Sequence, residues 1–239
     1  MKNSLKYIAF VIIGTLVSCK DEVQKPKVIY DAKSKAKEIT NTDSTQIEVA
    51  DLPIQMQGTN YLIHPVGDLR VFEKGSKRYG SSSVNDFSFT ISNLGEFEIT
   101  GYLQNLKFQK IDSDSIRPLS DKPVLILTAT YLKSIADKSL NQIMVYTLTD
   151  SDTNKDGKID TGDIKTLYLS DISGDNFTKV SADLQELVDW NLIESNNRLY
   201  FRTIEDTNQN GQFDKNDVLH YNYIDLAAKK WDVKSYKPT

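Results

Sequence analysis

The 239-residue chain lacks most of the features that assign a sequence to a familiar class. It has one cysteine, Cys19, so no disulfide framework can hold it together. Its formal net charge is −4, which leaves no basic surface for a phosphate backbone, and we expect no nucleic-acid partner. The two histidines, His64 and His220, belong to no catalytic motif, and the sequence has no G-x-S-x-G elbow, H-E-x-x-H pair or phosphate-cradling glycine loop. We therefore predict that the protein is not an enzyme.

An apolar, uncharged run lies close to the N-terminus. It reads IAFVIIGTLV over residues 8–17, which is too short to span a bilayer as a helix. Lys2 and Lys6 before it give the positive start of an export signal. The run ends in LVSC, residues 16–19, which resembles the lipobox of bacterial lipoproteins. This resemblance implies that residues 1–18 are a signal peptide and that Cys19 is lipidated and anchors the protein to a membrane. The alternative is an ordinary secretory signal with Cys19 as a core thiol.

The residues after Cys19 predict a location and a tether. KDE, residues 20–22, resembles the surface-export signal of some gram-negative lipoproteins, and it implies an outer-membrane lipoprotein exposed at the cell surface. Residues 19–50 are polar and charged and show little apolar periodicity apart from Val28, Ile29 and Tyr30. We predict that they form a flexible tether. The folded domain is expected to occupy residues 51–239.

The rest of the chain predicts a mostly β fold with antiparallel strands. Short runs rich in β-branched and aromatic residues are separated by turn formers, as in residues 87–91, 96–100, 124–128, 143–148 and 199–204. Helix is expected only near residues 131–140 and 182–189. Two similar units follow one another, at approximately 122–181 and 182–239, each with a strand, an Asp-rich loop, a strand, a turn and a short strand. The loops begin at Asp152 and Asp206, and a period of roughly fifty residues is typical of propeller blades.

Part of this repeat resembles a known family. LYLSDISGDN, residues 167–176, is similar to the Y-V-x-D-x-x-G strand and turn of TolB-type propeller repeats, and residues 188–190 with 197–201 resemble the opening of the next blade. The S-P-D-G core of that opening is replaced by ESNN, residues 194–197. The resemblance begins near residue 122 and implies propeller-blade-like repeats. Because the body holds about three blade-sized units where closed propellers have 4–8, we expect an incomplete or open propeller.

The Asp-rich loop of the first unit, residues 152–163 (loop 1), reads DTNKDGKIDTGD. It matches the twelve-residue EF-hand calcium loop, in which ligand oxygens recur at fixed positions and a glycine at position 6 allows a sharp turn. The predicted ligands are Asp152, Asn154, Asp156, the backbone carbonyl of Lys158, Asp160 and Asp163. Aspartate at position 12 in place of glutamate resembles the dockerin variety of this loop.

The second unit repeats the pattern in residues 206–217 (loop 2), which read DTNQNGQFDKND. The predicted ligands are Asp206, Asn208, Asn210, the carbonyl of Gln212, Asp214 and Asp217. Hard oxygen ligands favour Ca2+ over transition metals, and the four carboxylates of loop 1 should bind it more tightly than the three of loop 2. We therefore predict two Ca2+ sites. The alternative is a pair of Asx-rich turns that bind nothing.

The leading functional prediction is a lipid-anchored, calcium-binding protein of the cell envelope. The calcium is structural, and the protein serves as a binding or scaffold module whose partner is a glycan or an envelope protein. One alternative is a surface enzyme or accessory protein for polysaccharide breakdown, since paired carboxylates of a glycosidase are invisible without geometry. Another is a dockerin-like assembly module, which requires helices after the loops, whereas residues 218–224 alternate like a strand. Most of the twelve tyrosines are expected in the core or in cross-strand pairs, and the alternative is a sugar-stacking face.

Overall fold

The computed structural model describes residues 25–30, 48–68 and 90–238, and these residues form a mostly β protein with antiparallel strands. The fold class predicted from the alternating pattern is confirmed at this level. The elements are β1 (Glu48–Ala50), β2 (Ile54–Gln55), β3 (Tyr61–Asp68), β4 (Ser92–Leu94), β5 (Glu98–Lys110), β6 (Ile116–Pro118), β7 (Leu125–Tyr131), α1 (Lys133–Ser139), β8 (Ile143–Thr149), β9 (Thr166–Asp171), β10 (Thr178–Lys179), β11 (Gln185–Ile193), the 3-10 turn η2 (Glu194–Asn196), β12 (Arg198–Glu205), β13 (Val218–Asp225) and β14 (Val233–Ser235).

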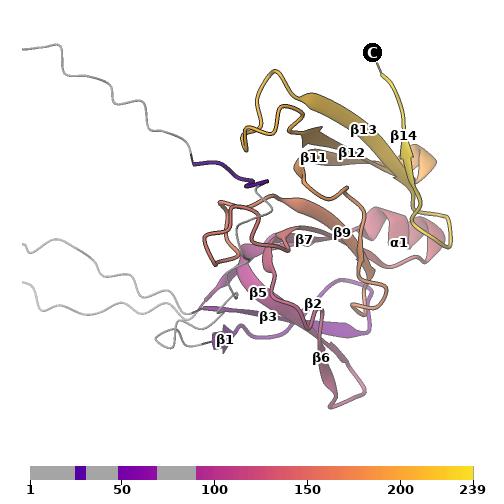
Figure 1. Cartoon of the computed structure of the whole chain (residues 1–239). Helices are drawn as coiled ribbons and strands as arrows, with labels where there is room; N and C mark the ends of the chain where they lie inside the picture. The colour runs from indigo at the N-terminus through magenta and orange to yellow at the C-terminus, as the bar shows by residue number, and fades with distance from the viewer. Residues whose placement is uncertain (1–24, 31–47, 69–89, 239) are drawn as a thin grey trace, which may run out of the picture.

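Ten strands form the larger sheet, sheet A. Its main path is β1-β3-β5-β7-β8-β9-β10, while β2, β4 and β6 pair at the side of that path. The pairing is irregular at residues 66–67, 100–103 and 126–128, and such bulges bend strands. The sheet is visibly curved (Figure 1). A core cluster of this sheet includes the fully buried Leu106, Phe108 and Tyr146.

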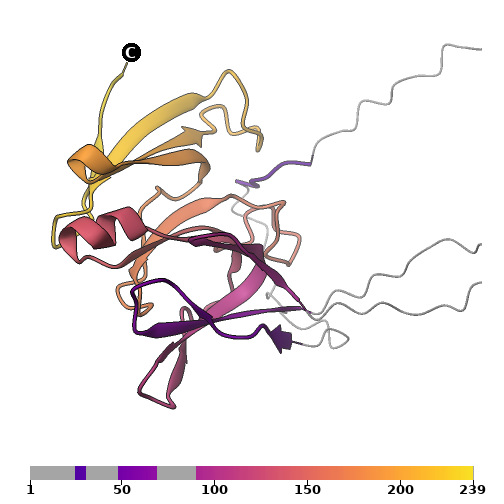
Figure 2. The same ribbon diagram turned by 180° about the vertical axis from the view of Figure 1, so that it is seen from behind.

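Strands β11 to β14 form the smaller sheet, sheet B, as a simple four-stranded meander. A second core cluster joins the two sheets, with Val145 and Leu167 contributed by sheet A and Leu199 and Ile224 by sheet B. The outward residues of β12 and β13 alternate with these buried ones, as the sequence predicts. Figure 2 shows sheet B from behind, stacked against α1 and the edge of sheet A.

The predicted repeat corresponds to two similar sets of strands. Both β7-β8-β9-β10 and β11-β12-β13-β14 are antiparallel meanders, and loops 1 and 2 fill the same connection, between the second and third strand of each. The two units differ in their surroundings, because β7 also pairs with β5 and so merges the first unit into sheet A. Within residues 48–68 and 90–238 the strands make two sheets and close no barrel.

One of the two predicted helices is present. Residues 131–140 contain α1, which buries Ile135 and Ala136. The helix expected at residues 182–189 is wrong, because β11 starts at Gln185 and pairs with β12. Among the described residues, no helix is long and apolar enough to cross a bilayer.

The predicted tether is only partly described. Residues 25–30, here called the N-terminal segment, lie against the body between loops 1 and 2 in both views (Figures 1 and 2). A flexible tether is therefore the wrong description for this short segment. The body also begins earlier than residue 51, because β1 starts at Glu48 and pairs with β3. Cys19, the signal peptide at residues 1–18 and the rest of the predicted tether before Glu48 lie outside the described residues.

Candidate metal sites

Loop 1 connects β8 to β9 and turns its polar side chains back onto its own backbone. Both carboxylate oxygens of Asp152 accept hydrogen bonds, from the N–H groups of Asp156 at 3.1 Å and Gly157 at 2.8 Å. The other loop oxygens accept in the same way: Asn154 Oδ1 from Asp156 N (2.9 Å), Asp156 Oδ1 from Lys158 N (2.9 Å), Asp160 Oδ1 from Gly162 N (2.6 Å), and Asp163 from Thr153 N (2.8 Å) and Asp160 N (3.0 Å). These bonds, formed within the loop itself, orient its side-chain oxygens.

Loop 2 makes seven hydrogen bonds equivalent to these, and in loop 1 Asp163 Oδ1 accepts a further bond from Asn154 N at 3.1 Å. The seven bonds of loop 2 are Asp206 Oδ1 from Asn210 N (3.2 Å), Asp206 Oδ2 from Gly211 N (2.7 Å), Asn208 Oδ1 from Asn210 N (2.9 Å), Asn210 Oδ1 from Gln212 N (2.8 Å), Asp214 Oδ1 from Asn216 N (2.7 Å), and Asp217 from Thr207 N (3.2 Å) and Asp214 N (2.8 Å). The change from Asp156 to Asn210 preserves its bond, because an amide oxygen accepts as well as a carboxylate oxygen.

The backbone conformations match too. Positions 4 and 6 of each loop have positive φ: 59° at Lys155 and 90° at Gly157, then 56° at Gln209 and 80° at Gly211. Glycine tolerates this region, whereas a side chain there is strained, which explains the glycine at position 6 of both loops. The two loops therefore share one backbone path as well as one set of hydrogen bonds.

The loops differ in how deeply they are buried. Asp163, at position 12 of loop 1, is 0 % exposed, whereas Asp217 at the same position of loop 2 is only half-buried. Burial raises the pKa of Asp163, although the backbone hydrogen bonds it accepts oppose that shift. In loop 2 the buried member is Asp206, and Asp214 is exposed. Each loop thus buries one of its carboxylates, the one at position 12 in loop 1 and the one at position 1 in loop 2.

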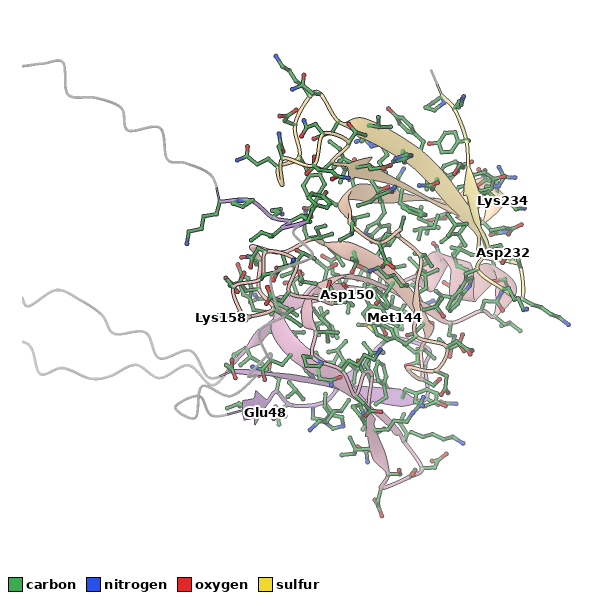
Figure 3. All side chains as sticks on the ribbon, in the orientation of Figure 1. Glu48, Met144, Asp150, Lys158, Asp232 and Lys234 are labelled. Atoms are coloured by element: carbon green, nitrogen blue, oxygen red, sulfur yellow. The ribbon has the colours of Figure 1, made fainter. Side chains whose placement is uncertain are left out.

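A charged cluster fixes the base of loop 1. Asp150, just before the loop, accepts hydrogen bonds from Lys179 Nζ and from the Tyr168 hydroxyl, both at 2.8 Å. Burial disfavours its ionised form, but these two bonds outweigh burial and lower the pKa of Asp150. Lys179 also pairs with Asp183 at 2.7 Å. Figure 3 shows Asp150 on the body side and Lys158 at the outer edge, on the side where the N-terminal segment arrives.

The donor atoms of both loops suit a hard cation. Every predicted ligand atom is a carboxylate, amide or backbone oxygen, and an oxygen set of this kind is what Ca2+ takes in proteins. In residues 25–30, 48–68 and 90–238, no three or more His, Cys, Asp or Glu side chains are grouped so that they could hold a metal ion. The carboxylates alone therefore do not form a preassembled centre. An ion would also need the amide oxygens of Asn154 or Asn208 and the carbonyls of Lys158 or Gln212, with the carboxylates drawn in around it.

The tyrosines of sheet B lie on its outer face. Tyr200 and Tyr223 are directly opposite one another on β12 and β13, with ring centroids 5.6 Å apart. Tyr236 contacts the edge of Tyr200 at 5.4 Å, and the Arg198 guanidinium lies 4.4 Å from the centre of the Tyr223 ring. Cross-strand pairing of these tyrosines is confirmed, on the solvent side of the sheet. A hollow of about 360 Å3 lies beside them, lined in part by Trp190, Tyr200 and Tyr236.

Each histidine has a polar partner. His64 Nε2 lies 3.1 Å from Gln109 Oε1, and His220 Nε2 lies 2.7 Å from Glu205 Oε2 on the neighbouring strand. Strands, rather than the helices that a dockerin has, follow both loops, as β9 and β13. No family model matches the chain, and no curated protein matches it.

The sequence did not point to three residues that support the loops. Thr153 ties loop 1 together, because its hydroxyl accepts a hydrogen bond from Ile164 N at 3.1 Å. Glu186 at the start of β11 is buried, and its Oε2 accepts the backbone N–H of Lys165 at 2.8 Å. Val28 of the N-terminal segment is 3 % exposed. The apolar run at Val28, Ile29 and Tyr30, inside an otherwise polar stretch, was the one signal of this contact.

Proposed function

We propose that this protein is a calcium-binding lipoprotein of the cell envelope, anchored through Cys19, whose two calcium ions stabilise a β-sheet binding or scaffold module. The observation that carries the proposal is the agreement between the loops. Seven side-chain-to-backbone hydrogen bonds recur at the same positions of two separate twelve-residue segments that share the calcium-loop motif. An isolated Asx turn has no reason to recur at the same five side-chain ligand positions in two separate loops.

In this proposal loops 1 and 2 are EF-hand-type sites set between strands. In loop 1 the ion is held by side-chain oxygens of Asp152, Asn154, Asp156, Asp160 and Asp163 with the carbonyl of Lys158. In loop 2 the equivalent set is Asp206, Asn208, Asn210, Asp214 and Asp217 with the carbonyl of Gln212. Calcium supplies positive charge that neutralises the clustered carboxylates of a long connection between two strands. The units β7–β10 and β11–β14 are then propeller-blade-like repeats, each stabilised by one ion.

The proposed location rests on the N-terminal sequence. The lipobox at residues 16–19 supports lipidation of Cys19, and residues 20–22 support display on the outer membrane. Labelling cells with a radioactive fatty acid tests this part. We expect label in the wild-type protein, found in the outer-membrane fraction and digested by protease added to whole cells. The Cys19→Ser variant should carry no label, and a labelled Cys19→Ser protein would rule out this anchor.

Thermal unfolding in calcium and in chelator tests the structural role. Two sites filled at about a hundred times their dissociation constants should raise the melting temperature by about 10 °C. The same concentration of magnesium should raise it less, because magnesium demands a stricter octahedral geometry. An unchanged melting temperature in millimolar calcium would mean that the loops are turns only, and the proposal would fail.

The outer face of sheet B favours glycan binding as the second candidate function, either as the binding activity of the module or as an accessory to polysaccharide breakdown. Tyr200, Tyr223 and Tyr236 present aromatic rings beside a hollow that also contains the polar Asp189 and Arg202. Aromatic faces with nearby hydrogen-bonding groups are suited to sugar rings. Affinity electrophoresis against envelope polysaccharides should show retardation that is lost in Tyr223→Ala and kept in Tyr102→Ala, an exposed tyrosine of sheet A. Equal migration of all three proteins at every polysaccharide would remove this candidate.

A further inference from the structure

The N-terminal segment lies in a groove between loops 1 and 2. Beside the docked segment an open cavity of about 660 Å3 remains, and it is lined by the segment itself, by both loops and by Glu186. In Figure 1 the segment passes between the tips of the two loops, and Figure 2 shows the same arrangement from behind. Parts of the chain that are far apart in sequence thus meet at the candidate metal sites.

On one side, the segment pairs with loop 1 at Thr153, the second position of that loop. Ile29 N–H donates to the Thr153 carbonyl at 3.0 Å, and the Thr153 hydroxyl donates to the Lys27 carbonyl at 2.7 Å. The same hydroxyl lies 3.2 Å from Asp163 Oδ1. One side chain therefore connects the docked segment to a predicted calcium ligand.

On the other side, the segment pairs with loop 2 at Gly211, its sixth position. Lys27 N–H donates to the Gly211 carbonyl at 2.7 Å. A Cβ atom on Gly211 would lie 2.4 Å from the Val28 carbonyl oxygen and 2.7 Å from Pro26 Cβ, so the segment fits only against a glycine. The Tyr30 hydroxyl hydrogen-bonds to Asp206, and burial together with that carboxylate raises the pKa of Tyr30 to about 12.

The segment also brings positive charge to an acidic region. Lys27 Nζ lies 2.9 Å from Glu186 Oε1, and Lys165 Nζ lies 3.3 Å from the same oxygen. Glu186 is not one of the predicted calcium ligands, so calcium in the loops would leave this ion pair in place. The remaining contacts are the backbone hydrogen bonds at Thr153 and Gly211 and the side-chain bonds of the Thr153 and Tyr30 hydroxyls. All of them require the loops to hold their carbonyl and side-chain oxygens in position.

We propose that the groove between the loops is a peptide-binding site for an extended basic segment, that residues 25–30 of the same chain are its occupant, and that this segment and calcium bind cooperatively. This inference rests on the proposed calcium sites. An ion that fixes loop 1 and loop 2 also fixes the Thr153 and Gly211 carbonyls that the segment needs. By linkage, the docked segment raises the affinity of the loops for calcium by the same factor.

The coupling controls the distance between the body and the anchor. Lys25 follows closely after Cys19, so a docked segment keeps the body within about 20 Å of chain from the lipid. After release, the chain between Cys19 and Glu48 is free of this restraint and its contour reaches roughly 100 Å. Calcium thereby determines whether the domain is held at the membrane or extends away from it.

Hydrogen exchange of the full chain, followed by mass spectrometry, tests the coupling. The amides of Lys27 and Ile29 report docking, because both donate to loop carbonyls. We expect them to exchange at least about tenfold more slowly in calcium than in chelator. Val28→Asp should release the segment and weaken calcium binding about fivefold or more. The control variant is Leu52→Asp, at a position that is 86 % exposed, and it should change neither the exchange rates of the segment nor the calcium affinity.

The possible results separate the two proposals. Calcium binding with faster exchange of the segment in chelator, and with the matching loss of calcium affinity in Val28→Asp, supports the coupling. Calcium binding with equal exchange in both conditions would overturn the coupling and leave the calcium sites standing. No calcium binding in calorimetry would overturn both.

Discussion

Loops 1 and 2 have the same internal structure and different surroundings. Their hydrogen bonds join the same loop positions, and their positive-φ positions are the same. Loop 1 joins two strands of the ten-stranded sheet and buries Asp163 completely, whereas loop 2 extends from the four-stranded sheet with Asn208, Asn210 and Asp214 exposed. The comparison shows that the twelve-residue pattern determines the shape of the loop, while its surroundings determine how deeply its carboxylates are buried.

The largest expected difference is at position 12. Asp163→Ala removes the acceptor of three partly buried backbone N–H groups, those of Thr153, Asn154 and Asp160, and should cost about 3–4 kcal/mol of unfolding free energy. Asp217→Ala leaves the N–H groups of Thr207 and Asp214 to bond with water instead, and it should cost about 1 kcal/mol of unfolding free energy. Urea denaturation in chelator measures both without a contribution from metal. Equal losses would show that burial does not distinguish the loops.

The next effect concerns the glycine of loop 2. Gly211 and Gly58 have the same φ of 80°, but a Cβ meets nothing within 4 Å at Gly58 and meets the N-terminal segment at Gly211. Gly58→Ala should cost about 1 kcal/mol from backbone strain alone. Gly211→Ala should cost about 2–3 kcal/mol because strain and collision add. The melting temperatures of the two variants give the comparison, and similar values would mean that the segment contributes nothing to the stability of loop 2.

A smaller difference is expected at position 2. The Thr153 hydroxyl bonds to Lys27 and Ile164, whereas Thr207 at the same position of loop 2 is exposed. Thr153→Val should cost about 1–2 kcal/mol, because it leaves the Ile164 N–H without its acceptor. Thr207→Val should stay within about 0.5 kcal/mol of wild type. Chemical denaturation of the pair tests this, and a Thr207→Val protein as unstable as Thr153→Val would contradict it.

The smallest expected effect exchanges position 5 of the loops. Asn210→Asp gives loop 2 a fourth carboxylate, and Asp156→Asn leaves loop 1 with three. Each change should move the calcium affinity of its own loop by about three- to tenfold, upward for loop 2 and downward for loop 1. Either change should reduce the difference in affinity between the two loops or reverse which loop binds calcium more tightly. Competition with a calcium-sensitive dye gives both constants. Affinities that do not follow the number of carboxylates would show that burial rather than charge sets their order.

The sequence predicted the local structure better than the assembly. Side chains and glycines within twelve residues determine the loop bonds, so spacing alone predicts the equivalence of Asp152 and Asp206. The alternation of β12 and β13 is equally local. The helix predicted at residues 182–189 is wrong because the conformation of these residues is decided by the pairing of β11 with β12. A pattern read from a single sequence does not contain that pairing.

Two further features depend on contacts between distant parts of the chain. The merging of the first unit into sheet A depends on β5 pairing with β7, and the sequence alone names no partner for either strand. The docking of Val28 beside Gly211 joins the N-terminal segment to a loop near the other end of the chain, and only an apolar run within a polar stretch hinted at it. Such contacts are set by tertiary packing, which overrides local propensity.

The most direct test of the calcium sites is a calorimetric titration of calcium into the metal-stripped full chain, beside Asp152→Ala and Asp206→Ala. Asp152 and Asp206 occupy position 1 of loop 1 and of loop 2, so each variant should remove one binding event and leave the other. We predict two events in the wild type, with the tighter one lost in Asp152→Ala and the weaker one lost in Asp206→Ala. The absence of any binding heat at millimolar calcium, or two events that persist in both variants, would contradict calcium binding by these loops.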